Sequence, residues 1–187
     1  MTTTSYPNPG IVMRHREFRS PFSITTVVRA AGLLILVAGA LAAQPAGRKP
    51  NFSGEWRMDA EKSDFGKFPA PTTILRTIAQ KDPDLVVDTT QRAANGEQTA
   101  HIVYRTDGVE TKNHLNTGEG ASHAFWDGND LVIRTTMTNS KGVDVLMEER
   151  WSLSPDGQTL TTLSHIETSK GGADLKLVCH RVKPQQG

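Results

Sequence analysis

The stretch Asn51-Phe52-Ser53-Gly54-Glu55-Trp56-Arg57-Met58 decides the fold of this chain. Phe52, Gly54, Trp56 and Met58 fall on one face of an extended segment, and the more polar residues between them fall on the other. This period of two predicts a half-buried first strand with Trp56 as its anchor. The stretch also marks the point at which a leader ends and a folded domain begins.

The leader has the features of an export signal. Residues 30–42 are apolar or small, follow an arginine-bearing segment and end in Ala40-Leu41-Ala42, which fits a signal-peptidase site. A transmembrane helix needs about 20 apolar residues, so this run is too short to span a bilayer comfortably. We therefore expect a signal peptide over 1–43, a linker over 44–50, and a periplasmic or extracellular domain over 51–187. An uncleaved membrane anchor is the alternative, and Met13 is an alternative start.

Length and composition bound what this domain can be. A chain of 187 residues supports one domain with a proper core. The formal net charge of +1 comes from interspersed charges, which argues against nucleic acid as a partner because phosphate binding needs clustered positive charge. The single cysteine, Cys179, excludes an internal disulfide and alternates with Leu175 and Leu177. We expect it to be a buried, inert thiol; an intermolecular bridge is the alternative.

From Thr72 onward the chain is a series of short strand-like runs separated by turn signals. Asn95-Gly96 is a strong hairpin signal, and residues 154–157 (Ser-Pro-Asp-Gly) suit a type I turn. No helical period persists. The pattern predicts an all-β fold, an antiparallel up-and-down meander of about eight to ten strands that closes into a barrel. The long connection over 59–71 should be irregular, with Phe65 and Phe68 covering an open end of the barrel.

Several phrases of the sequence resemble a known group of proteins. Gly54-Glu55-Trp56 is similar to the first-strand signature of lipocalins and their calycin relatives. Together with residues 61–65, 126–128 and 149–157, it resembles small secreted bacterial lipocalin-like proteins of unassigned function. The resemblance implies a lipocalin-like barrel. It also implies a late arginine that packs on the signature tryptophan, and Arg181 is the match for that arginine.

Glu149 is the residue that the strand pattern singles out for function. It lies in the middle of an apolar face made by Val143, Val145, Met147 and Trp151. An inward carboxylate needs a partner, because an unpaired buried charge is costly. We expect Glu149 to be a polar fixing point in a ligand cavity, with Arg181 as its candidate partner. The alternatives are a structural ion pair at the barrel end, or a bulge that turns Glu149 outward.

Other residue types give weaker signals. The aromatic residues Trp56, Tyr104 and Trp151 either line a cavity or simply fill the core. No two histidines share the i, i+2 spacing that would place them on one face of a strand, so we expect neither a metal nor a cofactor. No catalytic motif stands out, and the adjacent carboxylates of Glu148 and Glu149 point to opposite faces. We therefore expect no enzymatic activity.

These observations lead to two hypotheses about function. The first is a secreted barrel that binds a small apolar or amphipathic ligand in its interior, with a site made by Trp56, Tyr104, Glu149, Trp151 and Arg181. The second is a cell-envelope domain without a ligand, which binds another protein through its outer face. A contiguous exposed apolar patch would favour the second hypothesis.

Overall fold

The computed structural model describes residues 49–115, 118–139 and 141–183, and these residues form ten strands and no helix. The strands are β1 (Gly54–Met58), β2 (Thr73–Lys81), β3 (Asp84–Ala93), β4 (Gly96–Arg105), β5 (Thr111–Leu115), β6 (Gly118–Asp127), β7 (Asp130–Thr138), β8 (Asp144–Leu153), β9 (Thr159–Thr168) and β10 (Gly171–Arg181). The predicted leader lies outside the described residues.

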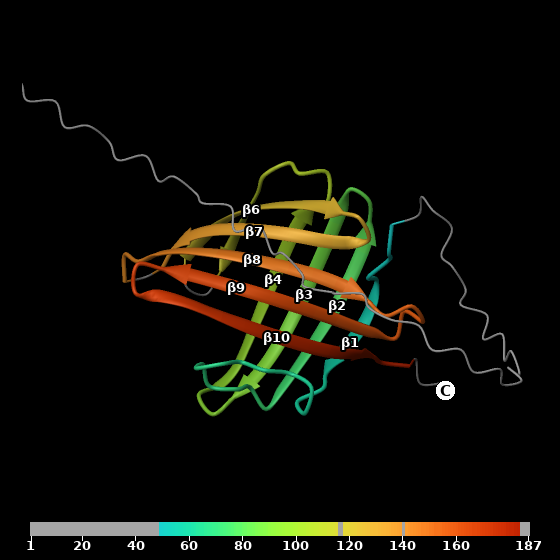
Figure 1. The fold of residues 1–187 in the computed structure, drawn as a ribbon, viewed down its shortest axis with the longest axis horizontal. Helices are drawn as coiled ribbons and strands as arrows, with labels where there is room; N and C mark the ends of the chain where they lie inside the picture. The colour runs from blue at the N-terminus through green and yellow to red at the C-terminus, as the bar shows by residue number, and fades with distance from the viewer. Residues whose placement is uncertain (1–48, 116–117, 140, 184–187) are drawn as a thin grey trace, which may run out of the picture. The chain divides into compact units, whose positions relative to one another are not determined.

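The strands form a single antiparallel sheet in the order β4-β3-β2-β1-β10-β9-β8-β7-β6-β5. In Figure 1 the sheet wraps round, so that β2, β3 and β4 pass behind β7 to β10 and cross them steeply. Each strand pairs with its neighbours in the chain, except that no ladder joins β4 to β5. In addition, the first and last strands pair with each other, with Trp56 opposite Arg181. The prediction of an up-and-down meander that forms a nearly closed barrel is confirmed.

The seam between β4 and β5 is bridged by the side chain of Asn113. Its Oδ1 accepts a hydrogen bond from the Val103 N–H at 2.8 Å, and its Nδ2 donates to the Val103 carbonyl at 3.0 Å. The amide therefore makes the pair of bonds that a backbone residue would make in a ladder. Asn113 is buried. One side chain thus joins the two strands at the point where the sheet does not close by itself.

The first part of the connection from β1 to β2 pairs with β10 and so extends the barrel wall beyond the end of β1. Asp64 and Lys176 exchange two backbone hydrogen bonds of 2.7 Å, so this part of the connection pairs with β10 beyond the end of β1. Phe65 is half-buried and packs against the core, as predicted. Phe68 does not cover the barrel end: it is 41% exposed. Its N–H bonds back to the Phe65 carbonyl in a local turn, which holds the backbone without burying the ring.

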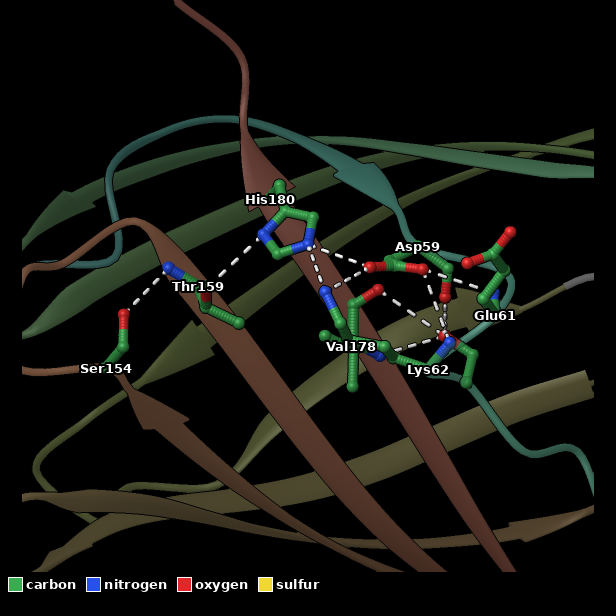
Figure 2. A network of polar contacts seen from close by, with 8 residues as sticks. Asp59, Glu61, Lys62, Ser154, Thr159, Val178 and His180 are labelled. Atoms are coloured by element: carbon green, nitrogen blue, oxygen red, sulfur yellow. Dashed lines mark hydrogen bonds and ion pairs between the residues drawn. The ribbon is translucent and has the colours of Figure 1, made fainter.

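Figure 2 shows the polar contacts that hold the start of this connection against the outside of β10. The Asp59 carboxylate accepts hydrogen bonds from the His180 ring at 2.9 Å and from Lys62 Nζ at 2.8 Å. The Ser63 hydroxyl accepts the Val178 N–H at 3.0 Å. These contacts, which we call the Asp59 clamp, cover Val178 and leave it only 4% exposed. The Asp59 clamp fixes the place from which Phe65 reaches the core.

Candidate functional site

One end of the barrel is filled with side chains. Four side chains that face inward near the β2–β3, β6–β7 and β8–β9 turns are at most 1% exposed: Leu85, Leu131, Trp151 and Leu160. Trp126 and Leu153 at the same end are half-buried and pack against this core. Phe52 precedes the first strand and stacks on Trp126, with ring centres 5.9 Å apart, while its edge meets Trp151. We call this the closed end.

Arg181 and Trp56 complete the closed end. Trp56 is fully buried, and the Arg181 guanidinium lies over its ring, 4.2 Å from the centre. Arg181 also donates hydrogen bonds to the carbonyls of Ser53 and Gly157. Gly54 has a φ of +135°, and a Cβ there would collide with the Arg181 guanidinium. The predicted match of Arg181 to an arginine on the signature tryptophan is therefore seen in the structure.

The other end of the barrel is different. Met147, Ile166 and Leu175 face inward by strand alternation, yet all three are only half-buried. Solvent therefore reaches these apolar side chains at this end of the barrel. This is the end at which the β3–β4, β7–β8 and β9–β10 turns lie. We call it the open end.

Glu149 lies between the two ends and points inward. The β8 ladder to β7 and β9 runs without a bulge, so the predicted alternative of an outward Glu149 is wrong. The carboxylate accepts a hydrogen bond from the Ser164 hydroxyl at 3.3 Å. Its burial raises the pKa of the Glu149 carboxyl, and the nearby Arg76 charge only partly opposes this.

The arginine that faces Glu149 is Arg76 on β2. The predicted pairing of Glu149 with Arg181 is wrong, because Arg181 is held over Trp56 at the closed end. Arg76 lies across the interior with its guanidinium carbon 5.4 Å from the centre of the Trp151 ring. Its charge influences Glu149 and also Tyr104, whose ring meets Trp151 edge-on at 6.5 Å. Strands β2, β4, β8 and β9 thus bring polar side chains together at the inner limit of the open end, which we call its floor.

The predicted site residues separate into two groups. Tyr104, Glu149 and Trp151 lie together with Arg76, whereas Trp56 and Arg181 belong to the closed end. Sequence reasoning missed Arg76 and Thr162. Arg76 carried the same signal as Glu149, because it lies between Ile74 and Ile78 on the apolar face of its strand. Thr162 gave no signal, since a threonine suits either face of a strand.

The thiol of Cys179 is buried, as predicted, at 1% exposure. Burial raises the pKa of this thiol, with the Arg76 charge acting weakly in the other direction. A raised pKa keeps the thiol neutral and unreactive. Cys179 therefore belongs to the wall of the site and supplies no nucleophile.

The large hydrophobic side chains that are exposed on the described residues come from five segments of the chain: Phe68, Leu75, Val109, Leu146 and Leu163. A groove of about 420 Å³ lies beside Leu163 and Leu175, and charged side chains of both signs, such as Asp174 and Lys176, border it. No group of three or more His, Cys, Asp or Glu side chains in the described part could hold a metal ion. No helix in this part is long and apolar enough to cross a membrane.

Comparison with known proteins finds likeness in fold alone. No family model and no curated protein sequence matches the chain. Among solved structures, a secretory abundant heat soluble (SAHS) protein of Ramazzottius varieornatus matches with a TM-score of 0.51 and 9% identity, over 70% of this chain and 94% of that one. SAHS protein 4 of the same organism matches with a TM-score of 0.50 and 11% identity, over 71% and 95%.

A third structure is zebrafish ileal bile acid-binding protein in complex with cholic acid, with a TM-score of 0.48 and 17% identity over 70% of this chain and 98% of that one. At these identities the likeness concerns architecture. The chain has an antiparallel up-and-down β-barrel fold.

Proposed function

We propose that the barrel binds a small apolar or amphipathic molecule through its open end. One observation carries this proposal: Met147, Ile166 and Leu175 face inward at the open end and keep solvent exposure, while Leu85, Leu131 and Leu160 near the closed end are almost fully buried. A barrel that served only as a rigid scaffold would be expected to fill both ends, because protein interiors pack densely. Apolar walls with a few polar groups at the bottom are typical of sites for small molecules.

The proposed ligand enters between the β7–β8 and β9–β10 turns and the β1–β2 connection. Met147 and Ile166 lie opposite each other in the β8–β9 ladder and make one wall. The apolar part of the ligand packs on these residues, and its innermost part reaches Trp151 and Tyr104.

We also propose that the domain acts outside the cytoplasm, after removal of the leader. This rests on the signal-like run over 30–42 and on the cleavage-like residues that follow it. Mass spectrometry of the intact protein from its own host tests this: a mature chain that begins near Ala43 or Gln44 is expected. A chain that retains residues 30–42 would contradict it.

The test of ligand binding uses two neighbouring residues on opposite faces of β8. Met147 faces inward, and Leu146 faces outward with 40% exposure. Met147→Trp fills the open end, whereas Leu146→Trp adds the same ring on the outside. We expect the delipidated protein to bind the uncharged dye N-phenyl-1-naphthylamine with a rise in fluorescence. Met147→Trp should lose most of this binding, and Leu146→Trp should keep it.

Equal dye binding by both variants, or no binding by the unmodified protein, would contradict the proposal. Native mass spectrometry of protein purified from its own host gives a second readout. A reproducible bound mass that Met147→Trp lacks and Leu146→Trp retains would identify the natural ligand by its mass.

A further inference from the structure

Four buried side-chain atoms of the described residues have no hydrogen-bond partner, and all four lie around Trp151. They are Arg76 Nε, Arg76 Nη1, Trp151 Nε1 and Thr162 Oγ1. Arg76 lies over the Trp151 ring, and Thr162 stands directly opposite Trp151 in the β8–β9 ladder. These atoms come from β8 and β9, which are consecutive, and from β2, which lies far from them in the chain. Their convergence at the floor of the open end is therefore a property of the closed barrel.

All four atoms can donate a hydrogen bond, and the three nitrogens can only donate. A buried donor without an acceptor costs about 1–3 kcal/mol, so such groups are rare and are seldom found together. Glu149 is the nearest acid, but its described hydrogen bond comes from Ser164. The Trp151 N–H lies close enough to favour the charged form of Glu149, yet it makes no hydrogen bond with it. The cluster lacks an acceptor.

The charges around this cluster are also unbalanced. Arg76 is a guanidinium, which stays protonated in proteins. Burial raises the pKa of the Glu149 carboxyl and of the Tyr104 phenol, which favours the neutral form of each. The buried Cys179 thiol is held neutral in the same way. No carboxylate of the described residues forms an ion pair with the Arg76 guanidinium, and its Nε and Nη1 have no hydrogen-bond partner, so its charge is unpaired at the floor of the open end.

We propose that this cluster binds the anionic head group of the ligand, and that the ligand is an amphipathic acid with a single negative charge, such as a long-chain carboxylate. This inference rests on the proposed function and adds the class of ligand to it. Carboxylate oxygens accept hydrogen bonds from the Arg76 guanidinium, the Trp151 indole and the Thr162 hydroxyl. The apolar chain of the acid extends past Met147 and Ile166 to the open end.

The arrangement discriminates between ligands of equal length. An alcohol head group supplies one oxygen and no charge, and so it leaves the Arg76 charge uncompensated. An ammonium head group adds a second positive charge beside Arg76 and has no acceptor. A carboxylate supplies two acceptor oxygens and the missing charge, and charge-assisted hydrogen bonds to guanidinium are among the stronger ones.

Three probes with the same twelve-carbon chain test the inference: dodecanoate, dodecan-1-ol and dodecylamine. Binding to the delipidated, full-length mature protein is measured by calorimetry at pH 7. We expect dodecanoate to bind at least about tenfold more tightly than dodecan-1-ol, since one charge-assisted bond to a buried group is worth about 1.4 kcal/mol or more. Dodecylamine should bind most weakly.

Variants of the donors locate the head group. Arg76→Leu should abolish the preference for dodecanoate over dodecan-1-ol. Arg57→Leu is the matched control, because Arg57 is exposed on the outside of β1. Thr162→Val removes one donor with little change of shape, and Trp151→Phe removes another with a smaller ring. They give a readout if Arg76→Leu fails to fold, and each should reduce the preference several-fold.

The outcomes separate the two proposals. If dodecanoate and dodecan-1-ol bind equally, the cluster is satisfied by water, and the inference is wrong while the barrel still binds apolar molecules. If dodecanoate is preferred but none of the three donor variants changes the preference, the head group lies elsewhere and the inference is again wrong. If none of the three probes binds, the proposed function itself fails.

Discussion

Arg181 on the last strand lies over the ring of Trp56 on the first strand, with its guanidinium carbon 4.2 Å from the ring centre. The same guanidinium donates to the carbonyl of Ser53, before β1, and to that of Gly157, before β9. It therefore joins three segments where the ends of the described chain meet. Because the contact is buried and joins β1 to β10, it contributes to closing the sheet as well as to filling its end.

The first prediction concerns Trp56. Replacing this fully buried ring with alanine should lower the free energy of unfolding by about 3–5 kcal/mol, as for other large core residues. Urea denaturation followed by circular dichroism measures the loss. Trp56→Phe keeps most of the volume and should cost less. A loss below about 1 kcal/mol for the alanine variant would show that Trp56 does not anchor the closed end.

The second prediction concerns Gly54, which has a left-handed φ and leaves room for Arg181. Gly54→Ala should cost about 1–3 kcal/mol, from backbone strain and from displacement of the guanidinium. In a double-mutant cycle with Arg181→Gln, the two losses should be less than additive, because the clash disappears once the guanidinium is gone. Gly128→Ala, at a glycine with open space around it, is the control for strain alone. Strict additivity would contradict the assigned role.

The third prediction is a pH dependence that originates in Glu149. The folded pKa of this carboxyl is raised above its unfolded value, so its contribution to stability is fully present below the unfolded pKa and is lost as pH rises through the folded pKa. Glu149→Gln retains an acceptor for Ser164 but cannot ionise. The variant should be more stable than the unmodified protein at pH 8, and this gain should disappear at pH 4. Urea midpoints at several pH values measure it. A variant that is less stable at pH 8 would show that the attraction between ionised Glu149 and Arg76 dominates.

The fourth prediction has the opposite sign and concerns the Asp59 clamp. Hydrogen bonds from Lys62 and His180 lower the pKa of the Asp59 carboxyl to about 2. Its stabilising contribution is therefore present above the unfolded value near 4 and is lost as pH falls through the folded value. Asp59→Asn should destabilise the protein at pH 6 and have little effect near pH 2. Lys62→Met should produce a smaller change in the same direction. An Asp59→Asn effect that is independent of pH would indicate that the charge has no part in the clamp.

The fifth prediction concerns the seam between β4 and β5. Asn113→Ala removes both side-chain bonds to Val103 and leaves a buried backbone donor and acceptor unpaired. We expect a loss of about 1–3 kcal/mol and faster amide hydrogen exchange at Val103 than at Tyr104. His114→Ala, on the exposed neighbour, is the control. Unchanged exchange at Val103 would mean that the seam is held by other contacts.

The strands and turns could be predicted because their signals are local. Alternation placed Trp56 and Glu149 on inward faces, and Asn95-Gly96 marked a hairpin, since each feature depends on residues adjacent in the chain. The contact between Arg181 and Trp56 came from a resemblance. Alternation alone could not have found it, because it says which face a residue occupies and not which strand lies opposite.

The partner of Glu149 could not be predicted for the same reason. Arg76 and Arg181 both occupy inward faces, and only the tilt and closure of the barrel decide which of them reaches the middle of the interior. Asn113 was equally hidden. Its side-chain amide makes the hydrogen bonds to Val103 that a backbone amide would make in a ladder between β4 and β5. No rule of composition or spacing marks an asparagine for such a role.

The order of the strands has a consequence for how the molecule is assembled. The first strand pairs with the tenth, while the middle of the chain crosses the unladdered seam. Until residues 171–181 have been synthesised, β1 to β4 and β5 to β9 are two open sheets with bare edges and no ladder between them. Removal of β10 would leave β1 to β4 and β5 to β9 with no ladder between them, and contacts such as those of Asn113 with Val103 would have to join the two parts.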